Sequence, residues 1–383
     1  MFDHTHYVPI LRWKAGEKRA LKALSHRDKA RMTPILEWSR TDDVSPEEDR
    51  AVRMPTPREL TKDVLDNWGA RPFFYDARRF WSDHLAGDST ELRRYAAEIA
   101  NGGLRAIPVF TLDDGEAYRR ALASLTSKDG VCVRLGFADI AGATMQERLA
   151  EFLKATGHDP SSVHLIADFE THFRDMDIPA FCSRFQAIRN YCTFTVAAGS
   201  FPLDLREFKG PQIFYLAREE WVRWHDQVNR DLLRRPTFGD YATLNPQLSP
   251  VKKGLNPSAT IRYTTEDYWL VMKGEGLRNR DGPRHEQYPA NASLLMKRPD
   301  YCGPAFSEGD RYIQDVAARS DGPGNPTTWV QAGVNHHVTF VIRQLAALVD
   351  ATAKGASTSK SRKGVRREGA SGSLGIDGEM NEL

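Results

Sequence analysis

The chain has 383 residues, of which 40% are apolar and 27% are charged, and its formal net charge is +2. This composition is typical of a globular protein with a sizeable core, and so small a net charge gives no global electrostatic reason to expect a nucleic-acid-binding protein. No apolar run approaches the roughly 20 residues that a membrane-spanning helix needs. The opening segment MFDHTHYVPILRWKAGEKRAL carries scattered charges instead of the apolar stretch of a secretory signal.

The cysteines indicate the compartment. Cys132, Cys182, Cys192 and Cys302 form no CxxC motif, and three of the four stand in apolar surroundings. They have the pattern of small core residues in a reducing compartment. Together with the opening segment, this predicts a cytoplasmic protein that does not enter a membrane.

The first part of the chain mixes helices with one short apolar run. Residues 15–31 have the spacing of an amphipathic helix, and the run MTPILEWS that follows contains Glu37 near its end. A polar, proline-bearing stretch then predicts a long loop. Thr56 and Pro57 have the pattern of a helix start, a cap followed by proline, and Gly69 has that of a helix end.

From residue 72 onward, apolar strands and amphipathic helices alternate. The predicted strands are 72–78, 105–112, 130–136, 163–170, 192–202, 236–243, 258–264 and 267–276, the last two as a strand pair or as one strand with its extension. The predicted helices are 88–103, 114–130, 143–157, 178–190 and 217–234. Such alternation demands parallel strands, and buried parallel strands read as continuous apolar runs.

Two architectures fit this alternation. An open doubly wound sheet usually has a Gly-rich first turn, and no GxGxxG follows any early strand. About eight strand–helix units suit a TIM-like (β/α)8 barrel, which we therefore predict. The turn-rich segment after residue 275 predicts extra C-terminal helices around 285–298, after Asp310, and from His337 onward. We expect one barrel domain over 1–353 and a disordered basic tail over 354–383.

In a (β/α)8 barrel the active site lies at the C-terminal ends of the strands, and here those ends carry charges. Asp168 and Glu170 end one buried strand and, two residues apart, point the same way. The predicted mouth comprises Glu37, Asp76, Arg134, Asp168, Glu170, Ser200, Asp240, Tyr241, Arg262 and Lys273. Charges that meet in one place must be paired, solvated or bound to a ligand, because burying one alone is costly.

These charges allow more than one interpretation. In the first, Glu37, Asp168 and Glu170 hold a divalent metal, Mg²⁺ or Mn²⁺, and act with Asp240 in acid–base catalysis. Arg134, Arg262 and Lys273 then hold the phosphate of a nucleotide or nucleic acid.

The alternatives use the same residues differently. The charges could neutralise one another, with Arg134 paired to Asp168 or Glu170 and Arg262 paired to Asp240, so that nothing binds. A third interpretation, in which paired carboxylates hydrolyse a sugar, is disfavoured by the basic strand ends.

Further polar residues near the C-terminus are candidates for ligand binding. His336 and His337 are adjacent, so on a helix they point about 100° apart and are ill placed to bind one metal; a buried, hydrogen-bonded histidine is the simpler interpretation. Ser307 is placed to cap a helix that starts near Asp310, and such a helix start could also bind an anion.

Several catalytic motifs are missing from the sequence. It contains no GxSxG, no P-loop, no HExxH and no cysteine zinc site. Serine hydrolysis, Walker-type nucleotide hydrolysis and zincin chemistry are therefore disfavoured.

Segments at both ends resemble a known family. YVPILRWKAGEKRAL, PILEW, FSEGDRYI and GVNHHVTFVIRQLA, in this order over residues 7–349, are similar to the phage and prophage "beta" protein family. The resemblance implies a role in phage–host or phage–phage conflict, with the product of a neighbouring phage or defence gene as partner. It transfers no catalytic residue. The positions it singles out are Tyr7, Pro9, Lys14, Glu17, Glu37, Ser307, Gly309, Asp310, His336 and His337.

Two hypotheses for the function follow. Either the mouth binds, and with a metal hydrolyses, a phosphate-bearing ligand, or the barrel is a non-catalytic interaction module of a defence or toxin-neutralising complex. The N-terminal segment with Tyr7, Lys14 and Glu17 either crosses the mouth or plugs the bottom of the barrel.

Overall fold

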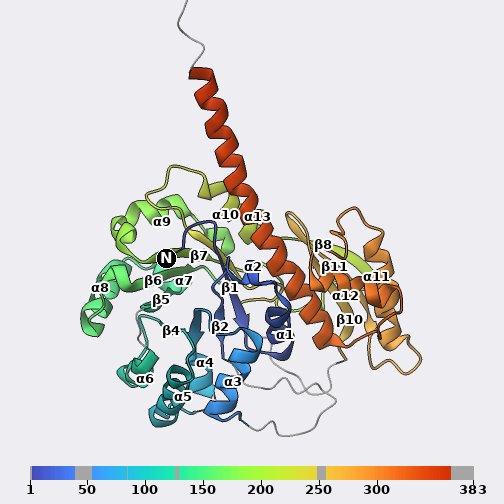
Figure 1. Ribbon diagram of the computed structural model, residues 1–383, viewed down its shortest axis with the longest axis horizontal. Coiled ribbons are helices and arrows are strands. Elements are labelled where there is room, and N and C mark those ends of the chain that lie inside the picture. The colour runs from blue at the N-terminus through green and yellow to red at the C-terminus, as the bar shows by residue number, and fades with distance from the viewer. Residues whose placement is uncertain (1, 39–53, 84, 126–128, 248–255, 364–383) are drawn as a thin grey trace, which may run out of the picture.

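A closed barrel of eight parallel strands forms the centre of the chain (Figure 1). The computed structural model describes residues 2–38, 54–83, 85–125, 129–247 and 256–363. The barrel strands, in their order around the ring, are β1 Tyr7–Arg12, β2 Ile35–Glu37, β3 Phe73–Asp76, β4 Ala106–Phe110, β5 Val131–Leu135, β6 Val163–Asp168, β7 Thr193–Ala197 and β9 Thr237–Asp240. The predicted TIM-like (β/α)8 fold is confirmed.

Helices that follow the strands surround this barrel. They are α1 Ala15–Ala23, α2 His26–Lys29, α3 Pro57–Asn67, α4 Arg78–Asp83, α5 Ser89–Asn101, α6 Glu116–Ala121, α7 Phe137–Ala141, α8 Met145–Thr156, α9 Ile178–Arg184 and α10 Glu219–Val228. Their ends follow the capping signals of the sequence. Thr56 and Glu59 form a capping box at the start of α3, and Gly157 adopts a left-handed conformation at the end of α8.

The strand that closes the ring is β1, which the sequence analysis did not predict. Tyr7 is in register with Phe238 of β9, and Ile10 is in register with Ile35 of β2, so β1 lies between β9 and β2 and closes the ring. The segment therefore neither crosses the mouth nor plugs the bottom at Tyr7. The residues before it pack at the bottom of the barrel, where the ring centroid of Phe2 lies 5.9 Å from that of His164 on β6.

The strands predicted at 258–264 and 267–276 lie outside the barrel. They are β10 Ser258–Thr264 and β11 Tyr268–Gly276, which form an antiparallel sheet with β8 Gln212–Ala217, itself not predicted. The few residues between β10 and β11 allow a hairpin, whereas a parallel crossover needs a dozen or more. This sheet has its own apolar core with α11 Gln287–Met296 and α12 Glu308–Ala317.

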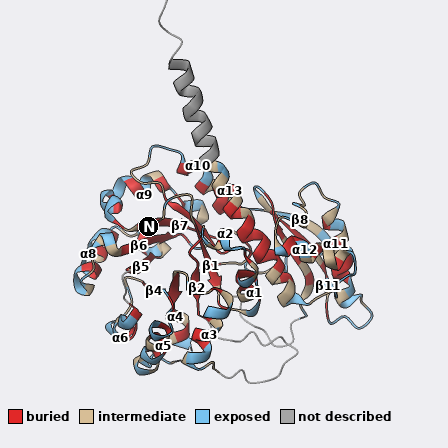
Figure 2. Ribbon diagram, viewed as in Figure 1, coloured by how far each residue is buried: buried red, intermediate tan, exposed pale blue. Residues whose placement is uncertain are grey.

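A long helix, α13 Pro326–Lys363, runs between the barrel and the small sheet (Figure 1). Its buried face includes Trp329, Val338 and Leu345, and Figure 2 shows this buried stretch where the helix passes between the two units. The helix continues past residue 354, where we predicted disorder to begin, and residues 364–383 lie outside the described part of the chain. Among the described residues, no helix combines the length and apolarity that crossing a membrane requires.

Alternation along the strands builds the barrel interior in layers. Ile10, Ile35, Phe74, Cys132 and Ile166 belong to one apolar cluster inside the ring. Two residues further along each strand, the same inward direction is taken by Arg12, Glu37, Asp76, Arg134 and Asp168. A polar layer thus lies directly above an apolar one, at the C-terminal ends of the strands.

Tyr7 joins the barrel seam to α13. Its hydroxyl donates to Asp240 Oδ1 at 2.5 Å and lies 3.2 Å from His337 Nε2, and all three side chains are buried. Asp240 in turn lies 2.9 Å from His337 Nε2. This triad connects β1, β9 and the long helix by side-chain hydrogen bonds.

We predict that Tyr7→Phe lowers the free energy of unfolding by about 2 kcal/mol, because a hydrogen bond to a buried carboxylate is lost. Tyr75→Phe is the matched control: Tyr75 is equally buried on β3, but its hydroxyl has no hydrogen-bond partner among the described residues. Removing that hydroxyl should leave stability unchanged or increase it. Urea denaturation measures both, and equal losses in the two variants would contradict the triad's contribution.

Candidate functional site at the barrel mouth

The guanidinium of Arg134 occupies the centre of the mouth. Its Nε and Nη2 donate to Asp168 Oδ2 at 2.8 and 2.7 Å. Its Nη1 donates to Glu37 Oε1 at 2.8 Å and to Asp76 Oδ2 at 3.0 Å. Nη2 also donates to the Tyr241 hydroxyl at 2.7 Å, and this hydroxyl donates to Asp168 Oδ2 at 2.5 Å. We call these five residues the Arg134 cluster.

Electrostatics keep Arg134 and Asp76 charged although both are buried. Burial opposes the charge on Arg134, but the oxygens of Tyr241, Asp168, Glu37 and Asp76 raise its pKa above the usual value. Burial likewise opposes ionisation of Asp76, yet Arg78 and Arg134 lower the pKa of this carboxyl. Arg78 is bonded to Asp76 through both Nε and Nη2, at 2.9 and 2.5 Å. The layer is therefore a compact ionic network, in agreement with the predicted pairing of Arg134 with Asp168.

A cavity of about 720 Å³ lies above this network. Its lining includes Glu37, Trp38, Asp76, Arg78, Arg79, Trp81, Asp113, Asp114, Arg134, Phe137, Asp139, Glu170, His172, Tyr241 and Gln247. Most of its acids have partners: Arg148 binds both Asp113 and Asp139 at 2.5 Å. The volume lies within the range of small-molecule sites.

Glu170 differs from the other acids of the mouth. Among the described residues its carboxylate has neither a hydrogen bond nor an ion pair. Partial burial, and then the neighbouring charge of Asp168, raise its pKa. Its backbone adopts φ 52°, in the left-handed region that a non-glycine residue rarely occupies. Glu170 is thus held at the rim with its carboxyl free.

Loop residues next to Glu170 complete the rim. The rings of Phe137 and His172 stack with centroids 3.9 Å apart and an interplanar angle of 5°. The guanidinium of Arg79, at the start of α4, has no hydrogen-bond or ion-pair partner in the described part of the chain and lines the same cavity. The sequence analysis missed Arg78, Arg79, Phe137 and His172. The available signal was their place directly after β3, β5 and β6, where the loops of a barrel carry function.

Six predicted site residues come together at the mouth. They are Glu37, Asp76, Arg134, Asp168, Glu170 and Tyr241. The other predicted residues lie elsewhere, for reasons that differ from one to the next.

Asp240 points away from the mouth. β9 places Tyr241 inside the ring, so Asp240 one residue earlier faces outward, where it binds Tyr7 and His337. Burial opposes its ionisation, but His337 and the hydrogen bonds lower the pKa of its carboxyl. The prediction of Asp240 as a mouth acid, and of its pairing with Arg262, is wrong.

Ser200 lies beside a buried acid instead of a ligand site. Its hydroxyl contacts Glu220 Oε2 and lies 3.1 Å from the carbonyl of Ala217. Burial raises the pKa of Glu220 to about 7, with smaller effects of Arg218 and Asp240. A protonated Glu220 can donate to Ser200, which leaves the serine hydrogen for Ala217.

Arg262 and Lys273 belong to the small antiparallel sheet and not to the barrel. Arg262 Nη1 donates to the Thr243 carbonyl at 2.7 Å, and its guanidinium lies 4.7 Å from the ring centroid of Phe201. Lys273 Nζ donates to the carbonyl of Phe208 at 2.7 Å. Both cations hold loops in place, and neither lines the mouth cavity.

Ser307, Asp310 and His336 form a buried structural network. Ser307 caps α12 by accepting from the Asp310 amide at 3.1 Å. Asp310 accepts from the Tyr263 hydroxyl at 2.7 Å and lies 2.8 Å from His336 Nδ1. His336 also lies 2.8 Å from the Thr264 carbonyl. The cap and the hydrogen-bonded histidine are confirmed, whereas Asp310 and His336 are fully buried and not placed to bind a ligand.

The arrangement of carboxylates does not fit the predicted metal site. Glu37 and Asp168 direct oxygens at Arg134, a cation that occupies the position a metal would take, and Glu170 stands apart from them. No group of three or more His, Cys, Asp or Glu side chains in the described ranges is placed to hold a metal ion. The divalent metal stays a prediction that this geometry does not favour.

We predict that Arg134→Met lowers the free energy of unfolding at pH 8 by about 3–5 kcal/mol, because buried carboxylates lose their counterion. The unpaired acids should then bind protons more readily when folded, so the deficit relative to the unsubstituted protein should shrink between pH 8 and pH 5. Arg105→Met, which breaks the exposed pair with Asp129, should cost at most about 1 kcal/mol. Urea denaturation tests this, and a pH-independent deficit would contradict it.

A second prediction concerns Glu220, whose pKa of about 7 exceeds the ordinary value of 4.5. Because the folded state holds the proton more tightly, this group makes stability fall as pH rises through that interval. Glu220→Gln should match the unsubstituted protein below pH 5 and exceed it by on the order of 3 kcal/mol at pH 9. Glu219→Gln, on the exposed side of α10, is the control. If the stability difference between Glu220→Gln and the unsubstituted protein does not change with pH, the raised pKa of Glu220 is refuted.

Comparison with known proteins places the chain in a family. Among solved structures, a mutant tryptophan synthase α-subunit from the hyperthermophile Pyrococcus furiosus is similar at 13% identity and a TM-score of 0.35, over 63% of this chain and 89% of that one. No curated protein matches. The family model described as Beta protein matches residues 7–343, which include all eight barrel strands, the small sheet and the first part of α13. The chain belongs to the Beta protein family.

Proposed function

We propose that the mouth of this barrel binds a nucleotide-sized ligand that carries both a phosphate and hydrogen-bond donors. The observation that carries the proposal is the presence of two unpaired, oppositely charged groups, Arg79 and Glu170, in one cavity. The Arg134 cluster beneath them has its hydrogen bonds satisfied within the protein. A ligand therefore meets a closed polar floor and two free charges above it.

Arg79 is the group that would hold the phosphate. A guanidinium presents paired N–H donors that match phosphate oxygens, and this one does not need to leave a protein carboxylate to bind them. Trp38 and Trp81 line the same cavity, and their indole N–H groups are buried without a hydrogen-bond partner among the described residues. We predicted Arg134 as a phosphate-binding residue, but its guanidinium already donates hydrogen bonds to Asp168, Glu37, Asp76 and Tyr241.

The rim suits the rest of a nucleotide. The parallel rings of Phe137 and His172 offer a flat face on which a base can stack. Glu170 can accept hydrogen bonds from hydroxyl or amino groups of the ligand. Its raised pKa also makes Glu170 a stronger base than an ordinary glutamate, so hydrolysis of the ligand belongs to the proposal. In that step water adds to the phosphorus, Glu170 takes the proton of the water, and the P–O bond to the leaving oxygen breaks.

The family resemblance supplies the biological setting of this proposal, a role in conflict between phages and their hosts. A second candidate function, a non-catalytic interaction module, is favoured by one observation. β8 is an edge strand of the small sheet, and its Tyr215 is 50% exposed. Exposed edges and aromatic side chains are features by which partner proteins bind.

Calorimetric titration of the full chain with AMP, GMP, ATP and GTP tests the first candidate. We expect binding of at least one nucleotide, weakened about tenfold or more by Arg79→Ala, because the phosphate loses its charged partner. Arg93→Ala, an exposed arginine on the outer helix α5, should leave the affinity unchanged. Absence of binding across the panel, or equal affinity of the Arg79 variant, would favour the interaction module.

Glu170→Gln separates binding from chemistry. The variant keeps the size and hydrogen-bonding capacity of the side chain but cannot accept a proton. Nucleotide affinity should persist, while any phosphate release measured with the unsubstituted protein should be lost. Retained turnover would exclude Glu170 as the proton acceptor.

A further inference from the structure

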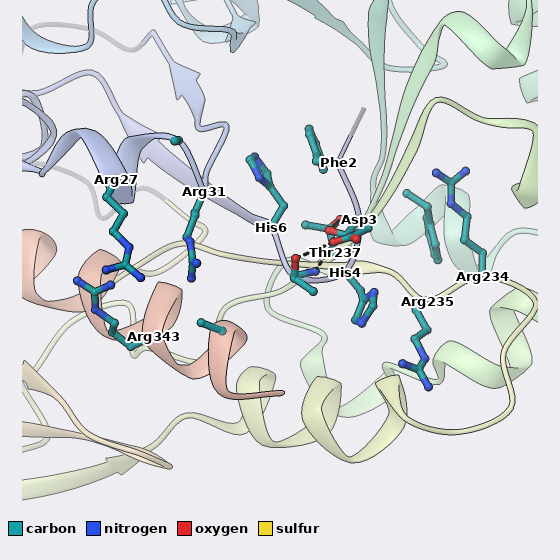
Figure 3. Close-up of a pocket in the computed structure, with 14 residues that line it drawn as sticks. Phe2, Asp3, His4, His6, Arg27, Arg31, Arg234, Arg235, Thr237 and Arg343 are labelled. Carbon is teal, nitrogen blue, oxygen red and sulfur yellow. Dashed lines mark hydrogen bonds between the residues drawn. The ribbon is translucent and has the colours of Figure 1, made fainter. Parts of the chain in front are cut away.

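A second cavity has a volume of about 1120 Å³; its lining residues are drawn in Figure 3. It lies at the N-terminal ends of the barrel strands, opposite to the mouth. Its walls come from segments at the N-terminal ends of β1, β2, β7 and β9, together with α2 and α13. The lining includes five arginines, Arg27, Arg31, Arg234, Arg235 and Arg343. We call this the basal arginine cavity.

Positive charge in this cavity is largely uncompensated. Asp3 is the one acid among the described residues that line it, and it accepts hydrogen bonds from Thr5 N and Oγ1 at 2.9 and 2.7 Å. Burial lowers the pKa of His4 and His6, that of His6 to about 4, so the positive charge of the cavity comes mainly from its arginines.

The five arginines differ in how they are held. Arg234 is part of the structure, since its Nη2 donates to the Cys192 carbonyl at 2.9 Å and its Nη1 to the Tyr191 carbonyl at 2.5 Å. Arg343 lies 3.4 Å from Asp28 and remains 41% exposed. In the described part of the chain, the guanidinium groups of Arg27, Arg31 and Arg235 have no hydrogen bond or ion pair. Three of the five are therefore free to bind an anion.

Their placement suggests a ligand with more than one charge. Figure 3 shows Arg27, Arg31 and Arg343 on one side of the cavity, with the guanidinium groups of Arg27 and Arg343 facing each other. Arg234 and Arg235 lie on the other side, beyond His4 and Thr237. Gathering like charges around one hollow costs free energy unless an anion enters it. A single phosphate could meet one side, whereas two or more linked phosphates could meet both.

We propose that the basal arginine cavity binds a polyanion that carries two or more phosphoryl groups, held by Arg27, Arg31 and Arg343 on one side and by Arg235 on the other. Guanidinium groups recognise phosphoryl oxygens through paired charged hydrogen bonds. The phosphoryl groups belong either to a free polyphosphate compound or to a nucleic-acid strand. This site is independent of the mouth, and its failure would leave the proposed function there untouched.

The test uses the full chain and three probes: inorganic tripolyphosphate, ATP, and a short single-stranded DNA with and without a 5′ phosphate. We expect micromolar or tighter binding of at least one, weakened about tenfold or more by Arg31→Ala and further by Arg31→Ala combined with Arg235→Ala. Arg79→Ala, at the mouth, should not weaken binding of tripolyphosphate. That control distinguishes this cavity from the site of the proposed function.

The probes identify the source of the phosphates. Binding of tripolyphosphate without DNA, or binding of ATP that Arg31→Ala weakens and Arg79→Ala does not, indicates a free compound. Binding of DNA only when it is phosphorylated indicates a strand end. Binding of both DNAs indicates the backbone, with an affinity that falls as salt rises. Because the substituted arginines have no partners in the protein, the variants should unfold at the same temperature as the unsubstituted chain or higher. No binding of any probe, or unchanged affinity in the double variant, overturns the proposal.

Discussion

The buried guanidinium of Arg134 is the charge on which the upper layer of the barrel depends. Three strands other than its own end in inward-facing acids, Glu37, Asp76 and Asp168, and like charges so close together are not stable without a counterion. One planar cation with donors on three nitrogens satisfies all three at once, which a lysine could not do. The same group orients Tyr241, so the floor of the mouth is set by a single residue on β5.

The pairing of charges around Arg134 determines which groups of the mouth remain available to bind a ligand. Because the strand-end charges satisfy one another, the groups left for a ligand come from the loops, Arg79 after β3 and Glu170 after β6. The neutralisation of strand-end charges and the existence of a ligand site therefore do not exclude each other. The network holds the floor rigid, and the loops above it supply the free charges, as in barrel enzymes whose scaffold positions mobile or variable loops.

The sequence predicted most of the barrel strands and their ends but not which way each end faces. Asp168 was placed correctly because Ile166 and Asp168 share a face of a long apolar strand. Asp240 at the end of β9 and Tyr241 directly after it are both polar, and only the pairing of β9 with β1 and β7 reveals that Tyr241 is the inward residue. β1 itself was not predicted, since Pro9 lies in it and proline lacks the N–H that strand pairing uses. Arg262 and Lys273 were misplaced because the continuous buried run in β11 reads like a parallel strand, so that β10 and β11 seemed to continue the barrel series.

The net charge of +2 conceals two ends of opposite character. Six carboxylates and three guanidinium groups line the mouth cavity, whereas one carboxylate and five guanidinium groups line the basal arginine cavity. A barrel strand of six residues, such as β1, spans about 20 Å, more than twice the Debye length of about 8 Å at physiological salt. Solvent-exposed charges at one end therefore have little effect on a ligand at the other. In the net charge of the whole chain, the negative charge at one end of the barrel offsets the positive charge at the other. An electrostatic argument for this protein therefore has to be made for each end of the barrel separately.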